Sequence, residues 1–309
     1  MAKQKVFLIV IMLSFSAEVF SALSLNGFDL RGASIPNDEI HHGGPPRDGI
    51  PAIHRPKFEQ AQQAHWLDHE DRVMGVVRNG IAKAYPIAIL NWHEIVNDRF
   101  GQEGIVVSYC PLCGTGIVFT VSGLKAKTFG VSGLLYNSDM LLYDLETESL
   151  WSQVMMEAVT GDLKGERFEA VVVSHTSWKD WRARHPETLV LSRDTGFNRN
   201  YSRDPYAGYG LSKDLYFPVK HQDRRYHPKA SILGLVVNGK AKAYPFSELD
   251  QAGGRVVDHL GGKKVTVVFD EEAVSARVYS EEGKELPALT AFWFAWIAFH
   301  PETAVFSHD

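Results

Sequence analysis

Residues 74–86 read MGVVRNGIAKAYP, and residues 233–245 repeat them as LGLVVNGKAKAYP. In both stretches two apolar-rich runs flank an Asn-Gly pair, at Asn79-Gly80 and at Asn238-Gly239. Asn-Gly between such runs is a strong signal for two antiparallel strands joined by a tight turn. The repeat therefore predicts the same strand hairpin twice in one chain.

Two weaker matches extend this repeat. GIVVSYCPLCGTGIVF at 104–119 corresponds to KKVTVVFDEEAVSARVY at 263–279, and SWKDWRARHPETLVL at 177–191 corresponds to FWFAWIAFHPETAVF at 292–306. The long period excludes a solenoid of short repeats. ILNWHEIVND and SWKDWRARH have helical spacing, whereas GIVVSYC and TGIVFTV alternate as strands. We predict an α+β fold of mostly antiparallel strands, an internally duplicated unit with short helices and a degenerate second copy.

The N-terminal sequence MAKQKVFLIVIMLSFSAEVFSALS has a basic start and a short apolar run. The run is too short to span a bilayer, so it predicts a secretory signal peptide and an exported protein, periplasmic or extracellular. The predicted segments are the signal peptide at 1–22, a lead-in at 23–72, the first repeat at 73–195, a connecting segment at 196–231 and the second repeat at 232–309.

The composition limits the classes of partner. The 309 residues are 45% hydrophobic and 22% charged, and the net charge of −5 is spread along the chain without a basic tract. A nucleic-acid partner is therefore not expected. No later segment is long and apolar enough to span a membrane, so we expect no stable membrane insertion after signal cleavage. A small molecule or a thiol is the expected substrate.

Both cysteines of the chain, Cys110 and Cys113, lie in the single turn YCPLCGT. A Cys-x-x-Cys pair brings two sulfurs close enough for a disulfide or a shared metal. A structural disulfide, half of a metal site and a reactive dithiol are all open at this point. In the repeat, Cys110 aligns with Asp270 and Cys113 with Ala273. Because the second copy lacks the cysteines, we expect the functional site in the first copy.

Two histidines are also specific to the first copy, since His93 aligns with Ala252 and His175 with Thr290. Two thiolates with His93 and His175 could hold zinc, and the thiolates alone would suit Cu(I). In NWHEIVND, helical spacing would place His93 and Asn97 on one face. His93 is therefore a candidate catalytic residue as well as a metal ligand, with copper or zinc as the candidate cofactor.

The first copy also carries an insertion at about 128–162 that the second copy lacks. It mixes aromatic residues with hydrogen-bonding groups, as small-molecule sites do. The candidate cofactor-binding residues are Tyr136, Asn137, Ser138, Asp139 and Trp151. The alternative is an ordinary strand pair that covers a core.

Six blocks in order resemble a DUF3179-type family of exported bacterial and archaeal proteins, a domain of unknown function. The blocks are HEIVND, YCPLCGTGIVF, FGVSGLLYNSDMLLYD, TESLWSQ, TSWKDWRARHPETLVLS and DPYAGY. The similarity covers residues 50–215 closely and the remainder more loosely. Some members of that family are selenoproteins, with selenocysteine in place of cysteine. The resemblance thus implies redox or nucleophilic chemistry at Cys110 and Cys113.

Three hypotheses follow. In the first, Cys110 and Cys113 cycle between dithiol and disulfide in a thiol-dependent oxidoreductase. In the second, the thiolates bind a transition metal together with His93 or His175. In the third, the protein is a non-catalytic binding module whose disulfide fixes a hairpin. We rank redox chemistry first and metal binding second.

Overall fold

The computed structural model describes residues 23–308, so the predicted signal peptide lies outside the described residues. The described chain consists mostly of small antiparallel sheets arranged as a five-bladed β-propeller. Within residues 23–308, no helix is long and apolar enough to cross a membrane. Export and the segment boundaries stay predictions.

Five sheets of three or more strands form the blades. In the spatial order of its strands, the insertion sheet is β13 (Glu157–Ala158), β12 (Leu150–Ser152), β11 (Asp139–Asp144), β10 (Phe129–Tyr136) and β3 (Ile40–His42). The cysteine sheet, also in spatial order, is β14 (Glu169–Val171), β9 (Thr115–Thr120), β8 (Glu103–Cys110) and β7 (Ile95–Phe100). The first hairpin sheet is β15 (Ser174–Ser177), β5 (Arg72–Arg78), β6 (Ile81–Pro86), β16 (Leu189–Leu191) and β4 (Phe58–Gln60).

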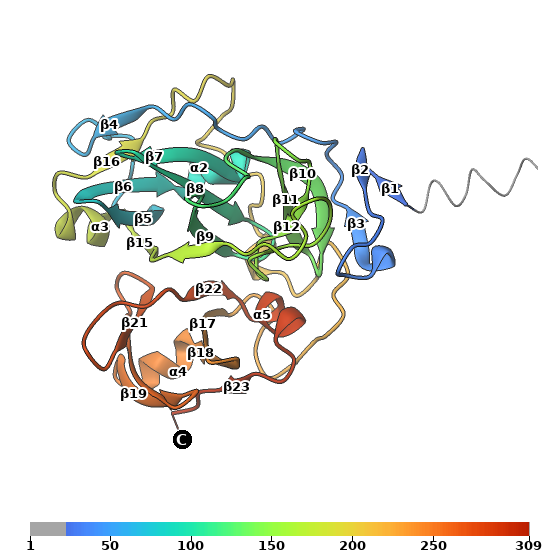
Figure 1. Cartoon of the computed structure of the whole chain (residues 1–309). Coiled ribbons are helices and arrows are strands. Elements are labelled where there is room, and N and C mark those ends of the chain that lie inside the picture. The colour runs from blue at the N-terminus through green and yellow to red at the C-terminus, as the bar shows by residue number, and fades with distance from the viewer. Residues whose placement is uncertain (1–22, 309) are drawn as a thin grey trace, which may run out of the picture.

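The C-terminal part supplies the other two blades. The second hairpin sheet is β22 (Leu289–Phe292), β17 (Ser231–Val237), β18 (Lys240–Pro245) and β23 (Ala304–Val305), and the C-terminal sheet is β19 (Arg255–Leu260), β20 (Lys263–Asp270) and β21 (Ser275–Ser280). A separate two-stranded sheet is β1 (Ser24–Leu25) with β2 (Phe28–Asp29). The helices are α2 (Ile87–His93), α3 (Trp178–Arg184), α4 (Phe246–Gln251) and α5 (Trp293–Phe299), with 3₁₀ turns η1 (Asn37–Glu39) and η2 (Tyr209–Leu211). Figure 1 shows the two C-terminal blades beneath the other three.

The fold-class prediction was wrong. The chain is not a duplicated α+β unit but a β-propeller, and its α-helices have only six or seven residues. The predicted helix in ILNWHEIVND ends at His93, because Glu94 adopts a positive φ of 58° and Ile95 begins β7. Asn97 therefore lies on a strand and shares no helix face with His93. The sequence repeat corresponds to repeated blades. The helix was predicted wrongly because short apolar runs occur in helices and in strands alike.

The two predicted hairpins are confirmed. Strand β5 pairs antiparallel with β6, and β17 pairs antiparallel with β18. Asn79 and Gly80 have φ values of 52° and 75°, and Asn238 and Gly239 have 49° and 74°. Positive φ at both central residues is the geometry that favours Asn-Gly in a two-residue hairpin turn. The turn chemistry read from the sequence thus fixes the register of both hairpin sheets.

Residues shared by the two copies tie each hairpin to its neighbouring sheet. The Tyr85 hydroxyl donates to Asp98 at 2.6 Å, and the Lys83 ammonium pairs with the same carboxylate at 2.7 Å. The second copy repeats the arrangement with Tyr244, Lys242 and Asp258. Because the side chains of Lys83 and Asp98 are both buried, each needs the other to offset the cost of burying a charge.

Candidate functional site

The cysteine turn lies between two strands, as the sequence predicted. Cys110 ends β8 and pairs with Thr115, the first residue of β9. The Cys113 amide donates to the Cys110 carbonyl at 3.2 Å, and Gly114 completes the turn with a positive φ of 61°. Both cysteines are buried and carry free thiols. The turn therefore holds two reduced sulfurs inside the propeller.

A carboxyl group from the insertion sheet joins the two sulfurs. One ligand atom each from Cys110, Cys113 and Asp139 lies within 4.8 Å of the other two, and all three residues are buried. Asp139 follows the hairpin turn Asn137-Ser138, whose φ values are 52° and 65°. The Cys113 thiol donates to the Ser138 carbonyl at 3.2 Å. Within residues 23–308 this is the one group of three or more His, Cys, Asp or Glu placed to share an ion; we call it the dithiol–Asp139 cluster.

Buried polar groups position the Asp139 carboxyl. Its Oδ2 accepts a hydrogen bond from the Val154 amide at 3.2 Å, and its Oδ1 lies 3.3 Å from the Thr115 hydroxyl oxygen. The Thr115 hydroxyl also lies 2.6 Å from Gln153 Oε1, and the Gln153 amide donates to the Ser108 hydroxyl at 2.7 Å. Such a connected network fixes the orientation of the acid, because each buried polar group has a bonding partner.

Burial sets the charge states in the dithiol–Asp139 cluster. It raises the pKa of Asp139 from its ordinary value to about 7, although hydrogen bonds from Val154 and Thr115 act in the opposite direction. Burial also raises the pKa of Cys113 well above the ordinary thiol value, and the hydrogen bond with Cys110 adds to the shift. At neutral pH Asp139 can therefore both take up and release a proton, while Cys113 remains a thiol.

The two histidines predicted as ligands lie in other hydrogen bonds. His93 is buried, with Nδ1 at 2.7 Å from the Pro51 carbonyl oxygen and Nε2 at 2.7 Å from the Tyr201 hydroxyl. His175 Nε2 lies 3.1 Å from the Gly116 carbonyl oxygen, and burial lowers its pKa to about 4. Neither histidine belongs to the dithiol–Asp139 cluster. Their catalytic and metal-binding roles stay predictions.

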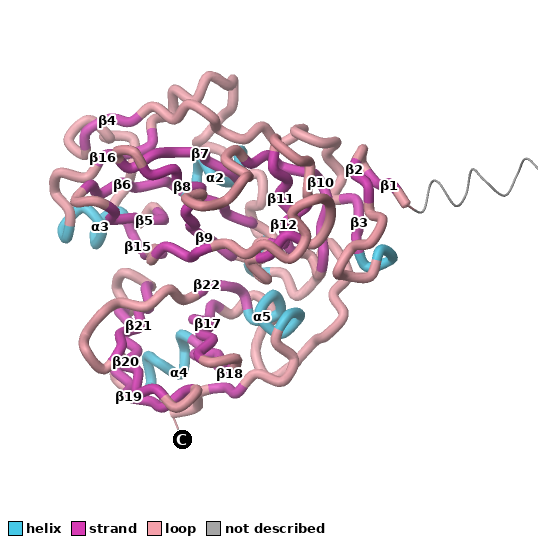
Figure 2. The backbone as a smooth tube through the Cα atoms, in the orientation of Figure 1, coloured by secondary structure: helices cyan, strands magenta, loops and turns pink. Residues whose placement is uncertain are grey.

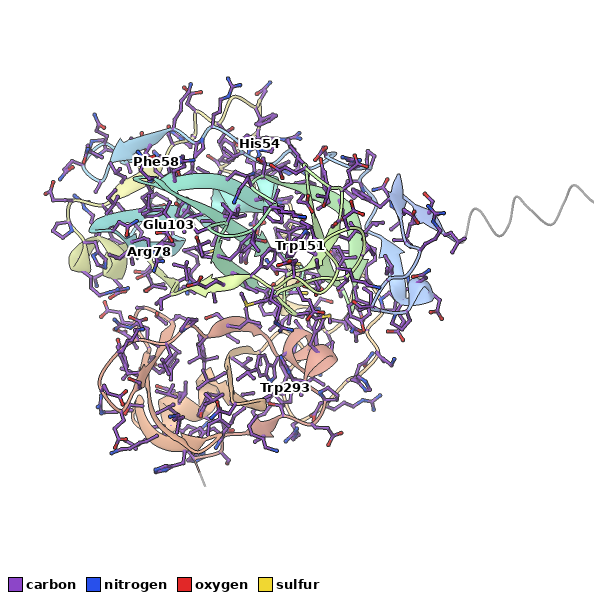
Figure 3. All side chains as sticks on the ribbon, in the orientation of Figure 1. His54, Phe58, Arg78, Glu103, Trp151 and Trp293 are labelled. Atoms are coloured by element: carbon purple, nitrogen blue, oxygen red, sulfur yellow. The ribbon has the colours of Figure 1, made fainter. Side chains whose placement is uncertain are left out.

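Trp151 and Tyr136, predicted to line a cofactor site, pack against other aromatic rings. The buried Trp151 stacks on Phe168 at a centroid distance of 4.6 Å, and its indole donates to Asp144 at 2.9 Å. Figure 3 shows Trp151 among the strands of the insertion sheet. Tyr136 meets the Phe299 ring edge-on at 5.6 Å. Trp151 thus belongs to a core shared with the cysteine sheet, and of the predicted residues the insertion brings Ser138 and Asp139 to the sulfurs.

The family assignment comes from residues 47–286, which match a family model described as a protein of unknown function, DUF3179. The chain belongs to this family. The resemblance inferred from the six sequence blocks is confirmed at that level. Neither the curated proteins nor the solved structures give a significant match. The description of this family names no reaction, so the chemistry is inferred from the site itself.

The second hairpin sheet covers the cysteine turn of this DUF3179 protein. The Phe292 amide donates to the Cys113 carbonyl at 2.8 Å, and the Phe292 ring packs so closely that a Cβ on Gly114 would lie 3.0 Å from it. In Figure 2, β22 runs directly beneath β9. From the insertion sheet, Asn137 accepts a hydrogen bond from the Lys220 amide at 2.9 Å. The predicted connecting segment and the second copy thus help enclose the site of the first copy.

A cavity of about 360 Å³ lies beside the cysteine turn. Leu112 of the turn and Met140 of β11 form part of its wall, and Glu94 and Tyr206 supply polar groups to it. Burial raises the pKa of Glu94 to about 8, and the charge of Asp139 adds to the shift. Sequence analysis missed Glu94, although HEIVND was one of the blocks that identified the family. Helical spacing pairs Glu94 with Asp98 and gives no sign of the backbone reversal that places Glu94 in the cavity wall.

Proposed function

We propose that this DUF3179 protein is a thiol-dependent oxidoreductase in which Cys110 and Cys113 cycle between dithiol and disulfide and Asp139 accepts a proton. The proposal depends on one observation: two buried thiols lie close to a buried carboxyl group. The pKa of Asp139 is about 7. A general base is most effective when its pKa lies near the working pH, because it is then both available and basic enough.

The proposed oxidant is an organic hydroperoxide. The Cys110 thiol gives up its proton, its sulfur attacks the outer peroxide oxygen, and the O–O bond breaks. The leaving alkoxide takes up that proton and departs as the alcohol, which leaves a sulfenic acid on Cys110. Cys113 then gives its proton to Asp139 and attacks the Cys110 sulfur. The S–S bond forms, and hydroxide leaves as water after taking the proton from Asp139. One hydroperoxide and two thiols become one alcohol, one water and one disulfide, and a thiol reductant restores the dithiol.

Two contacts support this division of roles. Cys113 is fully buried, and its thiol faces the Ser138 carbonyl and the Asp139 carboxyl. Cys110 lies near Tyr206, which belongs to the cavity wall, as does Leu112 of the same turn. In this proposal a substrate in the cavity meets Cys110 first, and Cys113 resolves the sulfenic acid.

A metal site is the second candidate function. Cys110, Cys113 and Asp139 offer two sulfur ligands and one oxygen ligand within 4.8 Å of one another. Zinc accepts thiolate and carboxylate ligands together, whereas Cu(I) would use the thiolates alone. A bound cation would also remove the protons that burial otherwise keeps on these groups. The same three residues therefore serve either hypothesis.

One measurement separates the two candidates. We would isolate the protein anaerobically without chelators and determine the metal content and free-thiol count of the same sample. The redox proposal expects two free thiols, less than about a tenth of an equivalent of transition metal, and a disulfide after one equivalent of hydroperoxide. A stoichiometric metal that shields both thiols would replace the redox proposal with the metal site. Thiols that bind no metal and survive hydroperoxide would leave the non-catalytic binding module.

Asp139→Asn tests the proton acceptor. Asparagine keeps the shape of the side chain but cannot take the Cys113 proton. We expect hydroperoxide turnover at neutral pH to fall by about 10²-fold, the lower end of the usual contribution of general acid–base catalysis. The wild-type rate should rise with an apparent pKa near 7, and the variant should lack this rise. A steady-state rate profile between about pH 5 and 9 measures both. A variant with the wild-type profile would remove Asp139 from the mechanism.

Stability provides the control for this variant. The pKa of Asp139 is about 7 in the folded protein and near 3.8 when unfolded, so the folded state holds the proton more tightly. The contribution of this group to the free energy of unfolding is largest below about pH 4 and decreases as the pH rises to about 7. Asp139→Asn lacks this fall. Denaturant unfolding above pH 7 should therefore show a variant at least as stable as wild type, so lost turnover there cannot be attributed to unfolding.

A further inference from the structure

The cavity beside the cysteine turn has the size and lining of a small-molecule site. Its volume of about 360 Å³ falls within the range of ligand pockets. Aliphatic and aromatic side chains form most of its wall, among them Leu112, Leu135, Met140 and Phe217. Leu112 belongs to the turn that carries the two sulfurs. A molecule in this cavity would therefore lie against the cysteine turn itself.

Glu94 is the one acidic residue among the described residues of the cavity wall, and its backbone is strained. Its φ of 58° and ψ of −32° are sparsely populated by any residue other than glycine. Two hydrogen bonds hold it there: its amide donates to the Leu90 carbonyl at 2.7 Å, and its carbonyl accepts from the Tyr109 amide at 2.8 Å. Such strain costs about 1–3 kcal/mol and is concentrated at functional sites. Glycine would relieve it, yet the chain places a carboxyl group here.

The surroundings of Glu94 favour its neutral form. Glu94 is buried, and a carboxylate is costly to bury without a cationic partner. Among the described residues that line the cavity there is no lysine, arginine or histidine to pair with an anion. At neutral pH the Glu94 carboxyl therefore carries a proton and can donate a hydrogen bond.

We propose that this cavity binds a small, largely apolar molecule that carries one acceptor oxygen, with the Glu94 carboxyl as the hydrogen-bond donor to that oxygen. Only the identity of the physiological ligand rests on the proposed function. An organic hydroperoxide belongs to this class of molecule, and the dithiol would reduce it. Binding itself does not depend on the thiols.

A matched pair of ligands tests the hydrogen bond. Acetophenone has a carbonyl acceptor, whereas ethylbenzene has the same ring and a similar chain but no acceptor. Calorimetric titration of the mature protein should show acetophenone binding about tenfold more tightly than ethylbenzene, the size expected for one hydrogen bond to a buried donor. Glu94→Leu should remove this difference. Glu94→Gln, which keeps an N–H donor at the same position, should retain it.

Equal affinity for acetophenone and ethylbenzene would overturn the inference. So would tighter binding of 1-phenylethylamine than of acetophenone, because that result would identify a cation site.

The cysteine variants separate this inference from the proposed function. Acetophenone should bind equally well when Cys110 and Cys113 are both serine. If it binds but the wild type does not reduce cumene hydroperoxide, the redox function fails and the ligand site stands. If the hydroperoxide is reduced but acetophenone does not bind, the ligand site fails and the redox function stands.

Discussion

Replacing either Cys110 or Cys113 with serine is expected to lower hydroperoxide turnover by at least about a thousandfold. Serine keeps the size of cysteine but does not ionise near neutral pH and forms no S–S bond. Groups that act as one catalytic unit are strongly non-additive, so the double variant should be no slower than either single variant. Initial rates with cumene hydroperoxide and a thiol reductant measure the effect. Single variants with wild-type rates would exclude a dithiol mechanism.

The two single variants also test which sulfur attacks. In Cys113→Ser, hydroperoxide should leave a sulfenic acid on Cys110 that a dimedone probe traps, because the resolving thiol is missing. In Cys110→Ser, Cys113 should remain unlabelled, since its raised pKa keeps it a thiol. Labelling of Cys113 alone would reverse the roles. Alanine variants, which place no hydroxyl in the buried site, serve as folding controls monitored by circular dichroism.

Local signals in the sequence predicted the local structure well. The Asn-Gly pairs indicated both hairpins, and the alternation around YCPLCGT placed the cysteine turn between strands β8 and β9. The propeller was missed because its blades are completed by distant segments. Strand β3 pairs with β10, and β4 pairs with β16, across long stretches of chain. Such pairings leave no periodic signal in either segment.

The site could be predicted only in part for the same reason. The isolation of both cysteines in one turn identifies them, and the polar composition of the insertion identifies Asp139 as a ligand-binding candidate. The contact of Asp139 with the sulfurs arises because the tip of the β10–β11 hairpin meets the cysteine turn. Helical spacing in NWHEIVND pairs Glu94 with Asp98 instead. The backbone reversal at Glu94, which ends the helix and brings this residue into the cavity wall, has no signal in the neighbouring sequence.

Gly75→Ala is expected to lower the free energy of unfolding by about 3 kcal/mol, at the upper end of the usual cost of overpacking a core. A Cβ at Gly75 would lie 2.2 Å from Cε3 of Trp181. The indole cannot move aside, because it is buried, donates to the Thr188 hydroxyl at 2.9 Å and contacts the His185 ring at a centroid distance of 4.2 Å. Urea unfolding should show a lower midpoint with an unchanged m-value.

The repeat supplies a second test of the same contact and a way to connect it with the site. A Cβ at Gly234 would lie 2.2 Å from Trp296, so Gly234→Ala should cost as much as Gly75→Ala. Gly210→Ala is the control, because a Cβ there meets no atom within 4 Å. Gly234 lies on β17, which pairs with β22 over the cysteine turn. Gly234→Ala should therefore speed the reaction of both thiols with a thiol reagent more than Gly75→Ala does. Equal labelling rates would show that β22 does not control access to the sulfurs.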